Sequence, residues 1–152
     1  MSTVSVAAAR EVGAPAAAVF GYIADYREHH PRFLPPAFSG FTVEEGGVGP
    51  GTVVRFTVSA GGRSRPYRMR VDEPEPGRVL RESDLGSSLV TTFTVTPEGD
   101  RSRVRIETTW SGAPGIGGFF ERLFAPGAIR RIYDDELARL DGYARTQRAA
   151  GT

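Results

Sequence analysis

The sequence predicts an α+β fold in which a curved antiparallel sheet of about seven strands wraps around one long C-terminal helix. Segments in which apolar and polar residues alternate, separated by glycine and proline turns, fill most of residues 38–110. A stretch with apolar residues at spacings of three and four follows, from Gly115 to about Arg148. Because successive hairpins build an antiparallel sheet that twists and curls, the helix can lie on its concave side.

At the N-terminus, the pattern predicts one strand and then two short helices. Residues 3–10 alternate as a strand does. Pro15 suits the first turn of a helix. We expect that helix to end before Pro31, because the residue before a proline avoids helical backbone angles. A second, shorter helical turn is expected around residues 32–34.

Six further strands are predicted, at residues 38–45, 52–60, 63–73, 78–84, 88–96 and 101–110. The last is the clearest, because three arginines alternate with Val104, Ile106 and other apolar residues. Such alternation is typical of an antiparallel strand with one buried face. Gly61 and Gly62 predict a tight hairpin turn between two of these strands.

The apolar stripe of the long helix consists of Ile129, Ile132, Tyr133, Leu137, Leu140 and Ala144. Pro126 and Gly127 separate it from a more apolar part at residues 119–124. We expect the stripe to anchor the helix on the sheet, and residues 119–124 to border a pocket mouth and move to admit a ligand. A filled space between helix and sheet would indicate a structural domain, and a hollow space would indicate a binding pocket.

Length and charge limit the possible functions. The 152 residues fit one domain, residues 1–152, with an ordered core at about residues 3–148. The formal net charge of +1 gives no strong field that favours nucleic acid or an anionic membrane. No apolar run reaches the roughly 18 residues of a membrane span, and the first residues lack the pattern of a signal peptide. We therefore expect a cytoplasmic protein with no nucleic-acid partner.

Two missing residue types limit the chemistry. The chain contains no cysteine, which excludes disulfides, thiolate catalysis and Cys-ligated zinc. All 19 basic residues are arginines, so Schiff-base chemistry on a lysine is excluded. Abundant arginine, alanine and glycine are typical of a bacterial gene with high GC content.

The order of these elements resembles a known superfamily, and short segments carry the resemblance. They are Val4-Ser5-Val6, residues 14–20, Ile23-Ala24-Asp25, residues 30–35, residues 49–52 and residues 136–140. Together they make nearly the whole chain similar to the helix-grip proteins, the SRPBCC or START, polyketide cyclase and Bet v 1-like superfamily, in its polyketide cyclase/dehydrase-like branch. The resemblance implies an apolar cavity between sheet and helix that binds or transforms hydrophobic small molecules.

The two adjacent histidines, His29 and His30, lie in the irregular segment after the first helix. Adjacent helical residues point about 100° apart, so the pair is poorly placed to hold one metal ion, and we expect no metal site. A surface position satisfied by water is the favoured interpretation. A role for His30 in proton transfer at the pocket entrance is the alternative.

Tyr67 and Glu82 are further candidates for catalysis. Tyr67 alternates with polar neighbours and is expected to point inward, either as core or as a hydroxyl that orients a ligand carbonyl. Glu82 shares a strand face with Leu80, but each face of residues 78–84 carries one apolar residue, so its orientation stays open. An exposed or rim position is favoured. An inward Glu82 would need a partner or a raised pKa.

Aromatic, apolar and hydroxyl side chains are expected to bind the ligand. They are Tyr22, Tyr26, Phe33, Phe56, Met69, Thr91, Phe93, Trp110, Phe120, Phe124 and Ile132. We interpret Tyr22 and Tyr26 as neighbours on the first helix. For Trp110, core and pocket wall are both open.

These observations give three hypotheses. In the first, the protein binds a hydrophobic or polycyclic small molecule or a polyketide-like substrate. If it is an enzyme, it is a cofactor-independent cyclase or dehydratase in which His30, Tyr67 or Glu82 moves protons. In the second, it is a non-catalytic carrier or sensor of lipid-like ligands. In the third, ranked last, it binds a protein partner through the outer sheet face. No cofactor is expected, and both a monomer and a homodimer are open.

Overall fold

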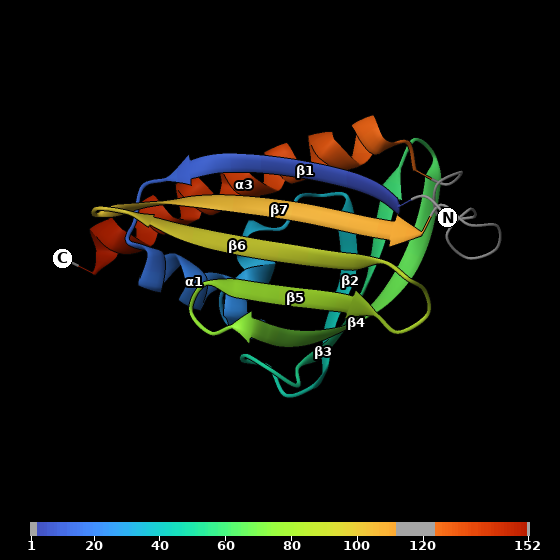
Figure 1. Ribbon diagram of the computed structural model, residues 1–152, viewed down its shortest axis with the longest axis horizontal. Helices are drawn as coiled ribbons and strands as arrows, with labels where there is room; N and C mark the ends of the chain where they lie inside the picture. Colours follow the sequence, from blue (N-terminus) through green and yellow to red (C-terminus); the bar gives the residue numbers. More distant parts are fainter. Residues whose placement is uncertain (1–2, 112–123, 152) are drawn as a thin grey trace.

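The computed structural model describes residues 3–111 and 124–151. In chain order its elements are β1 (Thr3–Val12), α1 (Ala16–Ala24), η1 (His30–Phe33), β2 (Phe38–Glu45), β3 (Val53–Ala60), β4 (Arg63–Glu75), β5 (Val79–Asp84), β6 (Val90–Glu98), β7 (Arg101–Ser111) and α3 (Pro126–Ala150). The predicted helix-grip fold is confirmed, with seven antiparallel strands, two short helices between β1 and β2, and a long C-terminal helix (Figure 1).

The sheet has the strand order β1-β7-β6-β5-β4-β3-β2. Consecutive hairpins build β2 to β7, and β1 then pairs antiparallel with β7 from Thr3 opposite Ser111 to Val12 opposite Ser102. The strands β2, β3 and β4 bend away from the others, and α3 runs along the side of the sheet that they curve toward (Figure 1). The helix packs on β1, and α1 packs on β6 and β7. The described part of the chain contains no helix long and apolar enough to cross a membrane.

The first helix, α1, ends at Ala24, before Pro31 as predicted, but it leaves out Tyr26, so the interpretation of Tyr22 and Tyr26 as neighbours on this helix was wrong. Asp25 instead forms a β-bridge with Val48, and the Tyr26 backbone N–H donates to the Gly47 carbonyl oxygen at 2.8 Å. Gly47 has a φ of 142°, which a residue with a side chain rarely adopts. These contacts with the glycine turn bind the backbone just after α1 in a non-helical conformation, and Tyr26 therefore lies outside the helix.

The long helix α3 begins at Pro126, which occupies the first-turn position that suits proline. The predicted start at Gly115 lies outside the described residues, as does the apolar part at residues 119–123, whose predicted gating role stays a prediction. Beyond Glu136, the residues Leu137, Leu140 and Ala144 are buried in the core. The second half of the helix is therefore the packed half.

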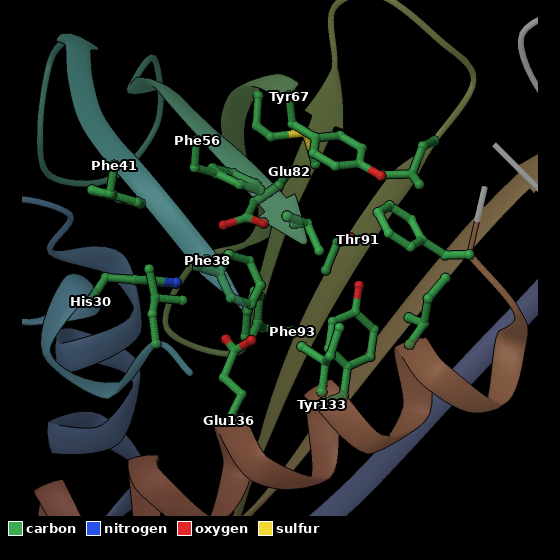
Figure 2. Close-up of a pocket in the computed structure, with 17 residues that line it drawn as sticks. His30, Phe38, Phe41, Phe56, Tyr67, Glu82, Thr91, Phe93, Tyr133 and Glu136 are labelled. Carbon is green, nitrogen blue, oxygen red and sulfur yellow. The ribbon is translucent and has the colours of Figure 1, made fainter. Parts of the chain in front are cut away.

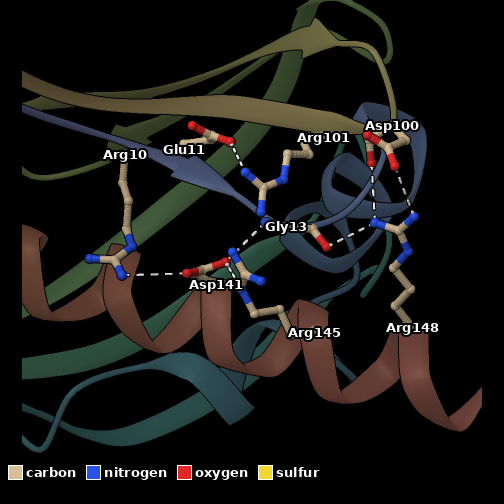
Figure 3. A network of polar contacts seen from close by, with 8 residues as sticks. All are labelled: Arg10, Glu11, Gly13, Asp100, Arg101, Asp141, Arg145 and Arg148. Carbon is tan, nitrogen blue, oxygen red and sulfur yellow. Dashed lines mark hydrogen bonds and ion pairs between the residues drawn. The ribbon is translucent and has the colours of Figure 1, made fainter.

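A polar network fixes this packed half to the end of β1 (Figure 3). The Asp141 carboxylate accepts a hydrogen bond from the Gly13 backbone N–H and another from Arg145, both at 2.9 Å, and a third from Arg10 at 3.4 Å. Burial alone would raise the pKa of Asp141, but these donors outweigh it and hold the pKa below its usual value. Near the helix end, Arg148 donates to the Gly13 carbonyl oxygen.

Candidate functional site

A pocket lies between the first half of α3 and the concave face of the sheet (Figure 2). Its lining residues are His30, Leu34, Phe38, Phe41, Phe56, Val58, Tyr67, Met69, Glu82, Leu89, Thr91, Phe93, Phe124, Ile129, Ile132, Tyr133 and Glu136. Its volume of about 60 Å³ holds a few water molecules. Sites for drug-sized ligands measure roughly 300–1,000 Å³, so a ring compound has to displace water and move the walls.

Glu82 points into this pocket from β5. Its register opposite Val71 on β4 and Thr91 on β6 places it on the concave face, where its side chain is 6% exposed. The favoured prediction of an exposed or rim position was wrong. Its Oε2 accepts a hydrogen bond of 2.5 Å from the Tyr26 hydroxyl. Burial raises the pKa of Glu82 to about 7, and the bond from Tyr26 opposes part of that rise.

Tyr26 holds Glu82 through its hydroxyl but does not line the pocket. Its ring is fully buried and stacks on the His30 ring, with centroids 4.4 Å apart and an angle of 12° between the planes. Burial, followed by the neighbouring charge of Glu82, raises the pKa of Tyr26 well above its usual value. The hydroxyl therefore stays protonated and remains a donor to Glu82.

His30 is buried beside Glu82, and its ring reaches the pocket (Figure 2). Its Nδ1 lies 2.7 Å from the Ile23 carbonyl oxygen, which only accepts hydrogen bonds. Nδ1 therefore carries the proton, and Nε2 is left as an acceptor. Burial lowers the pKa of His30 to about 4, so the ring is neutral at pH 7. The favoured prediction of a water-exposed position was wrong for His30.

His29 points elsewhere and does not line the pocket. Its Nδ1 lies 2.5 Å from the Tyr143 hydroxyl on α3. Its ring also packs against Tyr22, so these three side chains form a half-buried aromatic cluster between α1, η1 and α3. Among the described residues, no group of three potential metal-ligating side chains comes together.

Glu136 faces the pocket from α3, on the wall opposite Glu82 (Figure 2). It is 3% exposed, and no residue in the described parts of the chain donates a hydrogen bond to its carboxyl group. Burial, and then the charges of Glu82 and Asp135, raise the pKa of Glu136 well above its usual value. Glu136 was not predicted as a site residue, although its spacing from Tyr133 and Leu140 puts a charged side chain on the apolar face of the helix.

A row of hydroxyl groups crosses the wall between β6, β7 and α3. Thr91 Oγ1 lies 2.7 Å from Thr108 Oγ1, and Thr108 in turn hydrogen-bonds the Tyr133 hydroxyl. Burial raises the pKa of Tyr133 to about 12. Tyr67 also lines the pocket, where burial raises its pKa and the Arg65 guanidinium lies 4.5 Å from its ring centroid. These neutral hydroxyls can orient a ligand without changing charge.

The structure divides the predicted site residues into three groups. Those that line the pocket are His30, Tyr67, Glu82, Phe56, Met69, Thr91, Phe93, Phe124 and Ile132. Those that lie elsewhere are Tyr22, Tyr26, Phe33 and Trp110, of which the last three are fully buried. Phe120 lies outside the described residues. The unpredicted lining residues are mainly on β2 and α3, namely Phe38, Phe41, Ile129, Tyr133 and Glu136.

Comparison with known proteins supports the same architecture. Residues 3–145 match the family described as "Polyketide cyclase / dehydrase and lipid transport". The solution structure of the KanY protein is 39% identical, with a TM-score of 0.84, and the match covers 95% of this chain and 99% of that one. No curated protein matches the sequence.

Two more distant structures share the fold. The ZhuI aromatase/cyclase from Streptomyces sp. R1128 is 20% identical, with a TM-score of 0.75, and the match covers 95% of this chain and 94% of that one. Norcoclaurine synthase from Thalictrum flavum is 19% identical, with a TM-score of 0.73 and 97% of each chain covered. At these identities the likeness concerns the fold alone, and function has to be argued from the pocket.

Proposed function

This chain belongs to the polyketide cyclase / dehydrase and lipid transport family, and on that premise we propose that it is a cofactor-independent enzyme acting on a hydrophobic ring compound. The substrate is polyketide-like and carries carbonyl groups. The reaction is a cyclisation or a dehydration. Both reactions need a base to remove a proton beside a carbonyl and an acid to protonate an oxygen.

The observation that carries this proposal is the environment of Glu82. A carboxylate with a pKa of about 7 is a suitable general base at neutral pH, because it is partly ionised and still basic enough to take a proton. The Tyr26 hydroxyl orients it. The apolar walls exclude bulk water from the reacting carbon. In this proposal Glu82 takes the proton and leaves an enolate, which attacks a second carbonyl or expels a hydroxyl group.

His30 and Tyr67 have supporting roles in this proposal. The neutral His30 ring offers Nε2 as an acceptor for a ligand hydroxyl. The Tyr67 hydroxyl donates to a ligand carbonyl, and the high pKa that burial gives it keeps the donor proton in place. Phe41 and Phe56, whose planes are only 12° apart, give ring faces against which a flat substrate can stack.

Native mass spectrometry of protein purified from its own host can identify a co-purified compound. Its turnover is then compared in the wild type and in the variants Glu82→Gln, His30→Gln and Tyr67→Phe. We expect the Glu82 variant to lose about 100-fold or more in rate, as removal of a general base does. The exposed Glu98→Gln variant is the control. Unchanged turnover in all three pocket variants would contradict the catalytic proposal.

A second candidate is a carrier or sensor that binds a hydrophobic ligand and releases it unchanged. The predominantly apolar pocket wall favours it, since binding needs no titratable group. The same experiment separates the two candidates. A carrier releases the co-purified compound without chemical change, and its affinity responds to changes in the wall, such as Phe56→Ala, more than to Glu82→Gln.

A further inference from the structure

The proposed reaction needs an acid as well as a base, and two buried carboxyl groups line the pocket. They differ in what surrounds them. Glu82 has the Tyr26 hydroxyl as a donor at 2.5 Å, and a donor stabilises the ionised form of a carboxyl group. Within residues 3–111 and 124–151, Glu136 has no hydrogen-bond donor and no ion pair with an arginine. Its ionised form is therefore the less stable of the two.

The position of Glu136 suits proton delivery. It extends from α3 into the pocket, on the wall opposite Glu82, so a ligand in the pocket lies between the two carboxyl groups (Figure 2). Burying a polar group without a partner costs free energy, which leaves its presence there unexplained by packing. A proton on Glu136 can be donated to an oxygen of the ligand.

We infer that Glu136 is a second catalytic residue of this pocket, the general acid for loss of water from a β-hydroxy ketone whose α-proton Glu82 removes. The inference rests on the proposed function and adds to it both the acid and the substrate class. The α C–H bond breaks as its proton moves to the Glu82 carboxylate. A carbon–carbon double bond forms, the C–O bond to the β-hydroxyl breaks, and Glu136 protonates the departing oxygen to give water.

After one turnover Glu82 is protonated and Glu136 is ionised, so Glu82 must release a proton and Glu136 must take one up before the next turnover. Water that enters as the product leaves can carry the proton, because the cavity volume of about 60 Å³ accommodates a few water molecules. No oxidant, reductant or further reactant is required. The neighbouring His30 is neutral, and Tyr133 keeps its proton, since burial raises its pKa to about 12.

Acid and base can be tested separately with 4-hydroxy-4-phenylbutan-2-one, a β-hydroxy ketone with one ring. Removal of the α-proton is followed by NMR as deuterium uptake in D₂O. Loss of water is followed by the ultraviolet absorbance of the conjugated product. Deuterium uptake needs only the base, whereas loss of water needs both groups.

In wild type we expect both reactions. Glu136→Gln should keep deuterium uptake within about threefold and lose water elimination by about 100-fold, the usual range for a general acid. Glu82→Gln should lose both deuterium uptake and water elimination, and the exposed control Glu98→Gln should keep both. Glu136→Asp, which restores an acid on a shorter side chain, should recover part of the elimination, and the melting temperature of each variant checks its fold.

Equal losses of both reactions in Glu136→Gln, or no loss of either, would overturn the role of Glu136 while leaving Glu82 as the base. If Glu136→Gln does not fold, Glu136→Leu takes its place, and equal losses of both reactions, or no loss of either, in that variant would overturn the role. If the wild type catalyses neither reaction on this probe, the inference falls. The proposed function falls with it only if the co-purified compound is also released unchanged.

Discussion

Glu82 on β5 and Glu136 on α3 face one pocket from opposite walls, but of these two carboxyl groups only Glu82 has a hydrogen-bond donor among the residues that the structure describes (Figure 2). The donor is the Tyr26 hydroxyl, from a residue that does not itself line the pocket. Hydrogen bonding thus distinguishes two side chains of the same type.

Replacing Tyr26 by phenylalanine should raise the pKa of Glu82 further above about 7, because the lost hydrogen bond lowers that pKa in the wild type. A base with a higher pKa ionises at higher pH, so the rising limb of the pH–rate profile should move to higher pH. Carbon-13 NMR of the Glu82 carboxyl group measures the shift directly. Tyr22→Phe, whose hydroxyl does not contact Glu82, is the control, and an unchanged Glu82 titration in Tyr26→Phe would contradict the prediction.

Replacing Glu82 by glutamine should make the protein more stable relative to wild type as pH rises. The folded-state pKa of about 7 exceeds the usual value of 4.5, so the folded state binds the proton more tightly than the unfolded state. Wild type therefore loses stability between pH 4.5 and pH 7, by on the order of 3 kcal/mol in the limit of one isolated group.

Urea unfolding of wild type and Glu82→Gln at pH 5 and pH 8 measures this difference. The stability gap between the two proteins should change in favour of the variant at pH 8. Glu98→Gln, an exposed position, should show the same gap at both pH values. A gap for Glu82→Gln that does not vary with pH would show that the carboxyl group is not buried as described.

His30 should remain neutral at pH 6, with its proton on Nδ1. Burial lowers its pKa to about 4, and the Ile23 carbonyl oxygen can only accept a hydrogen bond. Nitrogen-15 NMR of the imidazole distinguishes both tautomers and the charged ring. Since the folded pKa is below the usual 6.5, this group should reduce stability as pH falls from 6.5 toward 4. A charged ring at pH 6 would contradict the prediction.

Replacing Asp141 by alanine should destabilise the fold by about 2–4 kcal/mol, because the Gly13 N–H and two arginines lose their buried acceptor. The pKa of Asp141 is lowered in the folded state, so this contribution is present above pH 3.8 and lost as pH falls through the folded pKa. Thermal unfolding at pH 7 and in acid measures it.

Asp134→Ala, at an exposed position on the same helix, is the matched control. The network joins the packed half of α3 to β1 and lies away from the pocket residues (Figure 3). Under conditions in which both proteins are fully folded, the affinity for a ligand should therefore be the same in Asp141→Ala and in wild type. An Asp141→Ala protein as stable as the Asp134→Ala control at pH 7 would show that the network contributes nothing.

Residue periodicity determined the strands and their faces. In β7, Val104 and Ile106 alternate with arginines, and a strand that is buried on one side allows only one face for each set. The stripe on α3 likewise fixed which side of the helix meets the sheet, and Glu136 lies on the same side, three residues after Tyr133 and four before Leu140. A charged residue at a position where the helix spacing predicts burial was the signal in the sequence that could have identified Glu136 as a site residue.

Tertiary structure decided the rest. Each face of β5 carries one apolar residue, so only pairing with β4 and β6 set Glu82 inward, opposite Val71 and Thr91. The end of α1 depended on the turn at Gly47, far along the chain, which bonds the Tyr26 backbone and leaves its hydroxyl at Glu82. Local sequence specifies which face of an element is apolar, but the pKa and partner of a buried group depend on elements distant in the chain.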